Sequence, residues 1–536
     1  MAIFEQTSQT KALIDDTEIL SCTVENAQTV KKHTEYILRV HRGILKESNW
    51  TVSHRYQHFV ELHNELVQAG YKLTLPPKKY FGNLQPSFIA ERQLALQEYI
   101  NEVLKHEILS LSLQVRRFLD PSNYPFNSAE QALQTVSIAL RGEGRFELKS
   151  ALPVIGWRVR KHYFLVTDTK TQTDCMLSWQ SYGPDRHLND KDMQTTFKSL
   201  LNLSHPHIEP ILALHSLETG AYAVRAILEK GSVRDMIYNK EYNKSYISKY
   251  ANPKENMPFT EDMISYYGYQ ILQALKFLHE KGIAHGNVHP GNIAIVQQRA
   301  VLLDVETTWL GGPHLFRQDI LQLRHNHSAE TIDVYCFGRT VYEMAFGRQL
   351  NNYYCDYIPE FIGNDLKCVF RRCLSRESCR DGGSTVQDVL QLALFRRAQA
   401  DERGVRGTLK FPLALKDQIK AAVSLAEDKL RIDQKKRRNA KRELRIQEIL
   451  GSEEEMKKHK RKEKQREGEW RSMSSIVESC NSPTTSSGST PTPPTMASMC
   501  TAAPDSPPSY EARTSLLAAI CAFDKSSLAT ATPSHS

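Results

Sequence analysis

Three separated segments in the first part of the chain carry cations and an aromatic ring that together could bind a phosphorylated ring compound. They are Arg55 with Tyr56 in RYQHFVEL, Lys78 in LPPKK, and Arg92 in AERQLALQEYI. Arginine suits a phosphate because its planar guanidinium group donates two parallel hydrogen bonds, and a flat aromatic ring can lie against a sugar. Each residue alone could equally be a solvated surface residue, so the prediction of an anion site rests on their combination.

Strands and helices must bring these segments together. Residues 19–24 and 36–40 are apolar runs typical of β-strands, and LTLPPKK is a proline-rich break where extended backbone is expected. After the break, apolar residues recur at helical spacing and predict one buried helix face: Leu96, Tyr99, Ile100, Val103 and Leu104. The pattern predicts a small unit of strands followed by helices.

The order and spacing of the arginine–aromatic pair, the Pro-Pro-Lys loop and the later helical arginine resemble those of PX (phox-homology) domains. We therefore predict a PX domain over residues 15–122, with a small antiparallel sheet plus helices. The resemblance implies that Arg55 binds the 3-phosphate of phosphatidylinositol 3-phosphate and that Tyr56 packs on the inositol ring. It also assigns the 1-phosphate to Lys78 and the remaining ring hydroxyls to Arg92.

Residues 146–398 resemble a protein kinase domain, because five landmarks occur in the order in which kinases have them. These landmarks are SHPHI (204–208), EKGSVRDMI (229–237), LHEKGIAHGNVHPGNI (278–293), LLDVE (302–306) and DVYCFGRTVYEM (333–344). We predict a bilobal protein-kinase-like fold here. The predicted fold class is thus multidomain α+β, with a PX domain, a kinase-like domain and a disordered tail.

The residues that phosphoryl transfer requires are altered in this domain. Kinases need a lysine on the phosphates, a carboxylate on magnesium and an aspartate that orients the incoming hydroxyl. By resemblance, Asn287 stands at the position of the catalytic aspartate, His289 at that of the following lysine, and Trp179 about where the strand lysine is expected. An amide cannot accept a proton, and a histidine is mostly neutral near pH 7. We expect no intact set of catalytic residues.

Neighbouring motifs are altered as well. The helix expected over 190–203 contains no glutamate, and residues 155–160 lack the repeated glycines that let backbone amides approach phosphates. Two metal-site positions match the family, Asn292 and Asp304, although the motif that begins at Asp304 reads Asp-Val-Glu without the usual glycine. We predict a pseudokinase that requires no cofactor, with weak binding of ATP and magnesium left open. The alternative is a weakly active, atypical serine/threonine kinase that uses Asp304 with magnesium and either His285 or His289 as its base.

Residues 412–470 read as one or two helices, first amphipathic and then strongly charged. Between residues 435 and 466 there are 14 Lys/Arg against 6 Asp/Glu, which equals the excess of +8 for the whole chain. Three interpretations of this run are open: a solvated charged segment, a polybasic contact with an anionic membrane, or a segment for nuclear import or RNA binding. No aromatic residues interleave with the cations, so no nucleic acid is expected.

The last part of the chain combines a polar stretch with two short motifs. Of residues 471–510, 24 of 40 are Ser, Thr or Pro, so we predict a disordered linker over 471–512. Within it, Pro507, Pro508 and Tyr510 form a Pro-Pro-x-Tyr sequence that resembles a ligand of WW domains. Residues 513–530 resemble a WASP homology 2 motif, an amphipathic helix that binds monomeric actin, although the basic residues that should follow Leu528 are missing.

Composition excludes several other classes. The 536 residues are 40% hydrophobic and 24% charged, which is ordinary for globular domains. No run is long and apolar enough for a membrane span, and the start lacks the pattern of a signal peptide. Ten scattered cysteines indicate reduced thiols rather than a disulfide framework.

The combination of these segments closely resembles the PX-domain-containing serine/threonine-kinase-like proteins. The resemblance implies a cytoplasmic protein, peripheral on endosomal or plasma membranes, that acts as a scaffold in the trafficking of membrane-protein cargo.

Overall fold

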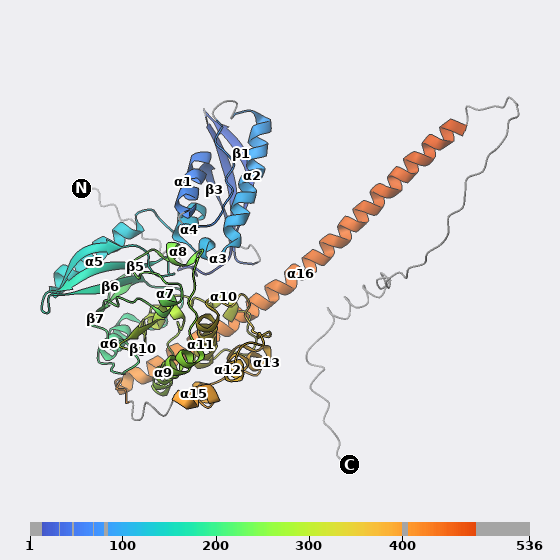
Figure 1. Ribbon diagram of the computed structural model, residues 1–536. Helices are drawn as coiled ribbons and strands as arrows, with labels where there is room; N and C mark the ends of the chain where they lie inside the picture. Colours follow the sequence, from blue (N-terminus) through green and yellow to red (C-terminus); the bar gives the residue numbers. More distant parts are fainter. Residues whose placement is uncertain are drawn as a thin grey trace, which may run out of the picture. The chain divides into compact units, whose positions relative to one another are not determined.

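The computed structural model describes residues 13–31, 33–44, 48–67, 69–79, 84–398 and 406–478 (Figure 1). The motifs predicted around Tyr510 and over 513–530 lie outside these residues. Among the described helices, none combines the length and apolar content that a bilayer-spanning segment needs.

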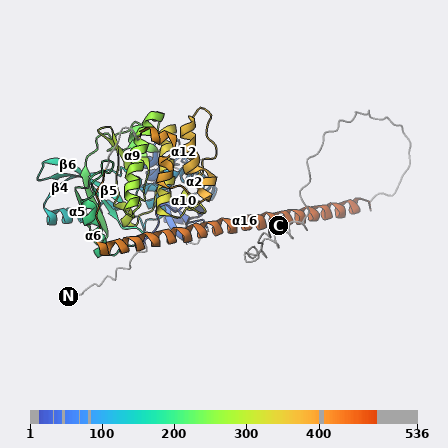
Figure 2. The ribbon, with the colours of Figure 1, turned by 90° about the horizontal axis from the view of Figure 1, so that it is seen from below.

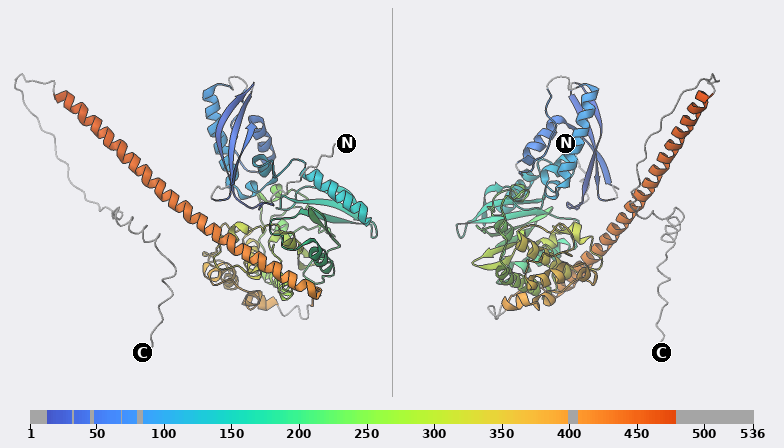
Figure 3. Two further views of the ribbon diagram at one scale, coloured as in Figure 1. Left: turned by 180° about the vertical axis from the view of Figure 1, so that it is seen from behind. Right: turned by 45° about the vertical axis from the view of Figure 1, so that its right-hand side comes forward.

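The N-terminal unit is a three-stranded antiparallel sheet with helices packed against it (Figures 1 and 3). Alternate residues of the central strand are buried, as the apolar pattern predicts, and they meet the apolar faces of the two longer helices. The elements are β1 (Leu20–Val30), β2 (His33–Arg42), β3 (Ser48–Arg55), α1 (Tyr56–Val67), α2 (Pro86–Lys105), α3 (Glu107–Ser110) and α4 (Leu113–Leu119).

The small lobe of the kinase-like unit is a five-stranded antiparallel sheet in the order β4-β5-β6-β8-β7. Helix α5 packs on this sheet through Ala132, Val136 and Leu140, so the lobe begins before residue 146, where the motifs placed its start. Its elements are α5 (Ser128–Glu143), β4 (Phe146–Leu152), β5 (Lys161–Asp168), β6 (Thr173–Ser181), α6 (Asp190–Leu201), β7 (Ala213–Ser216) and β8 (Gly220–Ala226).

The large lobe is helical and is organised around α11, which is buried along most of its length. The carboxylate of Asp333 on α11 accepts hydrogen bonds from the backbone amides of His285 (2.7 Å) and Gly286 (2.9 Å), which fixes the loop below the cleft. The elements are α7 (Val233–Ile237), α8 (Tyr246–Tyr250), α9 (Glu261–Glu280), η1 (Pro290–Asn292), β9 (Ile293–Val296), β10 (Arg299–Leu302), η2 (Thr307–Leu310), α10 (Arg317–Ile320), α11 (Ala329–Phe346), α12 (Asn364–Leu374), α13 (Arg376–Arg380), α14 (Val386–Leu390) and α15 (Ala393–Ala398).

Helix α16 (Leu413–Glu478) is one continuous helix that runs past residue 470, where the composition suggested a boundary. Its first turns bury Leu415, Ile419 and Ala422 in the hydrophobic core that the two lobes share. Figure 2 shows the start of α16 running along the kinase-like unit. Further along, the fully buried Gln434 donates hydrogen bonds to the carbonyls of Ile320 (2.9 Å) and Asn326 (3.1 Å). The start of the basic segment is therefore part of the kinase-like unit.

One buried arginine joins three distant parts of the chain. Arg317, on α10, forms ion pairs with Asp15 (2.5 Å), with Asp185 of the small lobe (3.0 Å) and with Asp433 of α16 (2.9 Å). Only 13% of its side chain is exposed, so these pairs are poorly screened by solvent. Arg317 thereby connects the segment that precedes β1, the small lobe and the C-terminal helix.

Replacing Arg317 by methionine should strongly destabilise the protein, because three carboxylates would lose a shared buried cation. Removing one partner of a buried ion pair commonly costs about 3–5 kcal/mol. Urea denaturation and limited proteolysis of α16 would measure the loss. Arg372→Met is a matched control, since Arg372 pairs with Asp388 at 3.2 Å while 49% exposed, and it should cost no more than about 1 kcal/mol. Equal effects of the two variants would contradict this account.

Buried histidines should make stability depend on pH. Burial lowers the pKa of His54 to about 4, from the ordinary value of 6.5. Below pH 6.5 the unfolded chain therefore binds a proton at His54, whereas the folded chain stays neutral there until about pH 4. The contribution of His54 to the free energy of unfolding is therefore lost as pH falls from about 6.5 to about 4. Between pH 7.5 and pH 5, the variant His54→Gln should lose about 2 kcal/mol less stability than the wild type. The expectation would be wrong if the free energy of unfolding fell by the same amount between these pH values in both proteins.

Candidate functional site

The segments predicted to bind a head group meet in the N-terminal unit. Tyr56 begins α1 and its hydroxyl donates a hydrogen bond to the carbonyl of Pro76. From α2, the guanidinium of Arg92 lies over the Tyr56 ring, 4.2 Å from its centroid, and donates to the carbonyl of Pro77 at 3.1 Å. The proline-stiffened loop before Lys78 is thus held against Tyr56 and Arg92 by both side chains.

The cations around this point differ in how firmly they are held. Arg92 is 7% exposed and also stacks on Phe88 at 4.3 Å, so its position is fixed before any ligand binds. Arg55 ends β3 with 51% of its side chain exposed, and its only carboxylate neighbour among the described residues is Glu35, 3.6 Å away. The sequence reasoning missed Lys79, whose ammonium lies 4.2 Å from the Phe88 ring. The site offers cations from a strand end, a loop and a helix, an arrangement that suits a phosphorylated ring.

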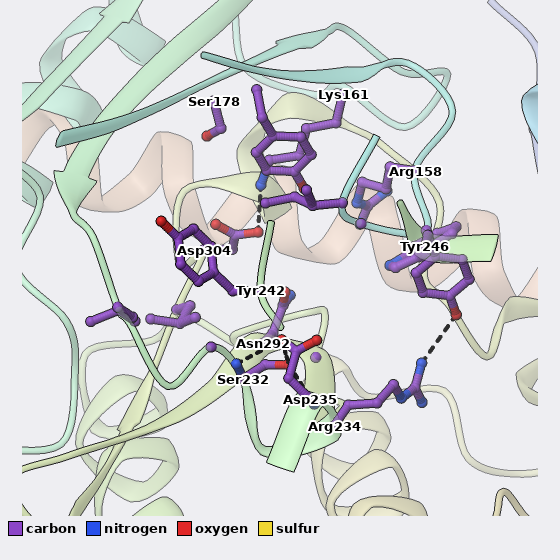
Figure 4. Close-up of a pocket in the computed structure, with 18 of the residues that line it drawn as sticks. Arg158, Lys161, Ser178, Ser232, Arg234, Asp235, Tyr242, Tyr246, Asn292 and Asp304 are labelled. Atoms are coloured by element: carbon purple, nitrogen blue, oxygen red, sulfur yellow. Dashed lines mark hydrogen bonds and ion pairs between the residues drawn. The ribbon is translucent and has the colours of Figure 1, made fainter. Parts of the chain in front are cut away.

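The second site is the cleft between the lobes of the kinase-like unit, where buried charges pair with each other (Figure 4). Asp304 lies 2.5 Å from the ammonium of Lys161 on β5 and 3.5 Å from the guanidinium of Arg225 on β8. Arg225 also forms an ion pair with Glu306. Burial alone would raise the pKa of Asp304, but Lys161 and Arg225 outweigh it and lower that pKa to about 2.

The lysine of this cleft comes from a different strand than the sequence comparison suggested. Trp179 does not face the cleft, because it is 8% exposed and packs in the apolar core on the other face of the sheet. Its neighbour Ser178 lines the cleft instead, since side chains alternate along a strand. The cation opposite Asp304 is Lys161, which the sequence reasoning did not single out. The sequence pattern that could have identified Lys161 is its spacing from Tyr163. Both residues lie on the strand after residues 155–160 and face the cleft.

Hydrogen bonds within the loop over 285–292 and its surroundings hold the side chains of His285, His289 and Asn292. Oδ1 of Asn287 and Nε2 of His289 are buried without a hydrogen-bond partner among the described residues. His285 donates from Nε2 to the carbonyl of Leu303 (2.7 Å) and accepts the Asn287 amide at Nδ1 (3.2 Å). His289 accepts the amide of Gly291 at Nδ1 (3.1 Å), and its other nitrogen then carries the proton of the neutral ring. Neither imidazole has a lone pair left with which to act as a base.

The remaining polar groups of this loop are also buried. Burial, and then the positive charge of Arg234, hold the pKa of His289 well below its ordinary value, so the ring stays neutral. Asn292 donates its amide to the carbonyl of Asn287 at 3.1 Å. His289 and Asn292 line the cleft together with Asp304, and the loop hydrogen bond of Asn292 uses its amide NH2 group.

The cavity itself is small. Its volume is about 140 Å³, below the roughly 300–1,000 Å³ of common ligand pockets. Arg158, from the loop over 155–160, lines it and donates to the carbonyl of Pro313 at 2.6 Å. Helix α6 carries acidic residues only in its first turn, where Asp190 pairs with Arg186.

These contacts do not fit a magnesium–nucleotide complex. The carboxylates of Asp304 and Glu306 are engaged by cations. In the part of the chain that the structure describes, no group of three or more His, Cys, Asp or Glu residues could hold a metal ion. The cleft as it stands is a network of ion pairs rather than a ready metal site.

Two family models match the chain: the PX domain over residues 43–122 and the protein kinase domain over residues 180–447. Both matches confirm the predicted fold class of a PX domain followed by a kinase-like fold. The kinase match extends into α16, in agreement with the packing of its first turns.

Several curated proteins are similar to the chain. The mouse (Mus musculus) PX domain-containing protein kinase-like protein is 38% identical over 448 residues, which cover 83% of this chain and 77% of the mouse protein. The Slowpoke-binding protein of Drosophila melanogaster is 31% identical over 233 residues, 41% of this chain and 45% of that protein. A probable inactive serine/threonine-protein kinase, slob2 of Dictyostelium discoideum, is 28% identical over 234 residues, which cover 42% of this chain and 39% of that protein. The match to the mouse protein covers more than two thirds of both chains, and the chain belongs to the family of PX domain-containing protein kinase-like proteins.

Proposed function

We propose that the protein is a phosphoinositide-binding pseudokinase scaffold that is recruited to endosomal or plasma membranes and regulates the trafficking of membrane proteins there. The observation that carries the proposal is the state of Asp304. The one carboxylate that matches the magnesium ligand of kinases is paired with Lys161 and Arg225 inside the cleft. A domain built in this way supports binding and assembly rather than phosphoryl transfer.

The membrane part of the proposal rests on the N-terminal unit. Arg92 is held between two aromatic rings, and Arg55 is exposed beside Tyr56 and free to turn toward a ligand. A head group with a 3-phosphate, as in phosphatidylinositol 3-phosphate, supplies an anion for Arg55 and a ring for Tyr56. The protein is then cytoplasmic and peripheral on the membrane, with the basic residues of α16 as a second contact.

The pseudokinase part rests on the engagement of the candidate bases and of the metal-site carboxylate among the described cleft residues. The atoms that could have served are engaged at His285, His289 and Asp304. Removing a single group from a preorganised catalytic site commonly costs about 10²–10³ in rate. We infer that no cofactor is required, and that ATP with magnesium binds weakly, after Arg158 moves.

Protein partners follow from the scaffold role. A relative is named Slowpoke-binding protein, which supports the binding of other proteins by this kinase-like fold. We assign membrane-protein cargo to the scaffold as a whole, monomeric actin to residues 513–530, and WW-domain proteins to the motif at Pro507, Pro508 and Tyr510.

The variant Arg55→Ala should lose binding to liposomes that contain phosphatidylinositol 3-phosphate, because it removes the half-exposed guanidinium assigned to the 3-phosphate. Liposome co-sedimentation of the full chain measures the effect, and a loss of at least about tenfold is expected for one charge-assisted phosphate contact. Arg39→Ala is the matched control, since Arg39 is also a partly exposed strand arginine, paired with Glu25. Unchanged binding by Arg55→Ala would refute the assigned site.

Phosphate transfer from radiolabelled ATP to a general protein substrate should stay at background for the wild type. The variants Asp304→Ala and Lys161→Met should give the same background, because neither residue is available for catalysis in the ion-paired cleft. Transfer that is robust in the wild type and lost in Asp304→Ala would instead establish the atypical kinase. A thermal-shift titration with ATP, with and without magnesium, separates weak binding from none.

A further inference from the structure

A groove that is separate from both sites lies between α16 and the large lobe, where α13 and the segment after α10 line it. It has a volume of about 410 Å³, which is in the range of pockets for small molecules. One wall is a single face of α16, where cations recur at helical spacing: Arg437, Arg438, Lys441, Arg442 and Arg445.

The opposite wall belongs to the large lobe and is basic as well. Arg324 lies in the segment after α10, and Arg376 and Arg380 come from α13. Tyr353 and Tyr354 form the floor, with the Lys441 ammonium 5.8 Å from the first ring and the Arg376 guanidinium 5.6 Å from the second. The lining contains no acidic residue among the described residues, so cations from three separate segments face each other across the groove.

Nearby carboxylates neutralise only part of this cluster. Asp319 pairs with Arg339 at 2.9 Å; it also attracts Arg437, but burial outweighs this attraction and lowers the pKa of Arg437. Asp356 pairs with Arg376 at 3.2 Å, but both side chains are at least half exposed, so that pair is weak. Lys441 donates only to the neutral amide oxygen of Gln322, at 2.6 Å.

Two further observations indicate that an anion is missing from the groove. The Nε of Arg437 and an Nη of Arg438 are buried and have no hydrogen-bond acceptor among the described residues. Burial, and then repulsion from Arg437 and Arg445, lower the pKa of Lys441. Like charges held this close are unfavourable until a ligand of opposite charge binds between them.

We propose that the groove binds one densely phosphorylated small molecule of the inositol polyphosphate class, either free or as the head group of a polyphosphoinositide. Eight cations around one small cavity match several phosphates on a single ring better than one phosphate. The walls converge on a concave space, whereas a flat bilayer contact or an extended nucleic acid would need cations spread along an open face. The inference does not depend on the proposed function of the other two sites.

The test uses the full chain and isothermal titration with inositol hexakisphosphate, with inorganic phosphate as the comparison. The wild type should bind one hexakisphosphate per chain and should bind inorganic phosphate far more weakly. The double variant Arg437→Glu with Lys441→Glu should weaken binding by at least about 100-fold, about tenfold for each lost charged contact. Arg376→Glu with Arg380→Glu, on the opposite wall, should do the same without touching α16.

The control is Lys435→Glu with Lys436→Glu, which changes the same charge on the same helix at exposed residues outside the groove. It should change affinity by no more than about threefold, since long-range attraction between exposed charges is screened. Equal losses in the control and groove variants, or no saturable binding by the wild type, would overturn the proposal. Tighter binding of a phosphopeptide or an RNA than of hexakisphosphate would overturn it as well.

A vesicle assay distinguishes the two sources of the ligand. Phosphatidylcholine vesicles with and without phosphatidylinositol bisphosphate are compared in an Arg55→Ala background, which removes the contribution of the N-terminal site. Binding that needs both the lipid and the groove residues identifies the head group as a ligand. Binding of soluble hexakisphosphate without groove-dependent vesicle binding identifies the free compound.

Discussion

The architecture depends on the ion pairs of Arg317 with three carboxylates from distant parts of the chain. Asp15 precedes the first strand, Asp185 belongs to the small lobe, and Asp433 lies on α16. Such a cluster is stable only when the carboxylates compensate the cost of burying the guanidinium, so each segment needs the others in place. Arg317 lies in the segment that follows the Asp304 motif, so this segment is tied both to the start of the described chain and to α16. A segment held in this way suits a kinase-like domain that presents a fixed surface rather than one whose catalytic segment must move.

The same principle explains the cleft. Buried acidic and basic side chains need partners of opposite charge, and those in and around this cleft form ion pairs with one another. The pairs are Lys161 with Asp304, Arg225 with Glu306, Arg234 with Glu343, and Lys249 with Asp235. Each pair removes a carboxylate that a metal could use or a cation that a phosphate could use. The groove beside α16 is the opposite case, since its cations face one another without acids in the lining. Charge that is paired stabilises a fold, whereas charge that converges without a partner indicates a ligand.

The local sequence pattern was sufficient for the elements and for much of the first site. The apolar spacing from Leu96 to Leu104 predicted the buried face of α2, and the landmarks over 204–344 predicted the kinase-like fold. Tyr56, Lys78 and Arg92 could be assigned to one site because short-range motifs carry them. The register of β6 could not be assigned, since a shift of one residue moves a side chain to the other face and the run from Cys175 to Gln180 has no clean alternation. Trp179 was therefore placed in the cleft, where Ser178 lies.

By itself, the sequence determined which residue types are missing from the kinase-like unit, where the excess of +8 lies, and that a basic helix follows it. Tertiary structure alone decided that Lys161 and Arg225 engage Asp304, that α16 packs on the large lobe through Gln434, and that five cations of its basic run line a groove with Arg324 and α13. The reason is physical. Secondary structure and motifs depend on neighbours within a few residues, whereas pairing of charges depends on distances between segments far apart in the chain, which only the folded protein defines.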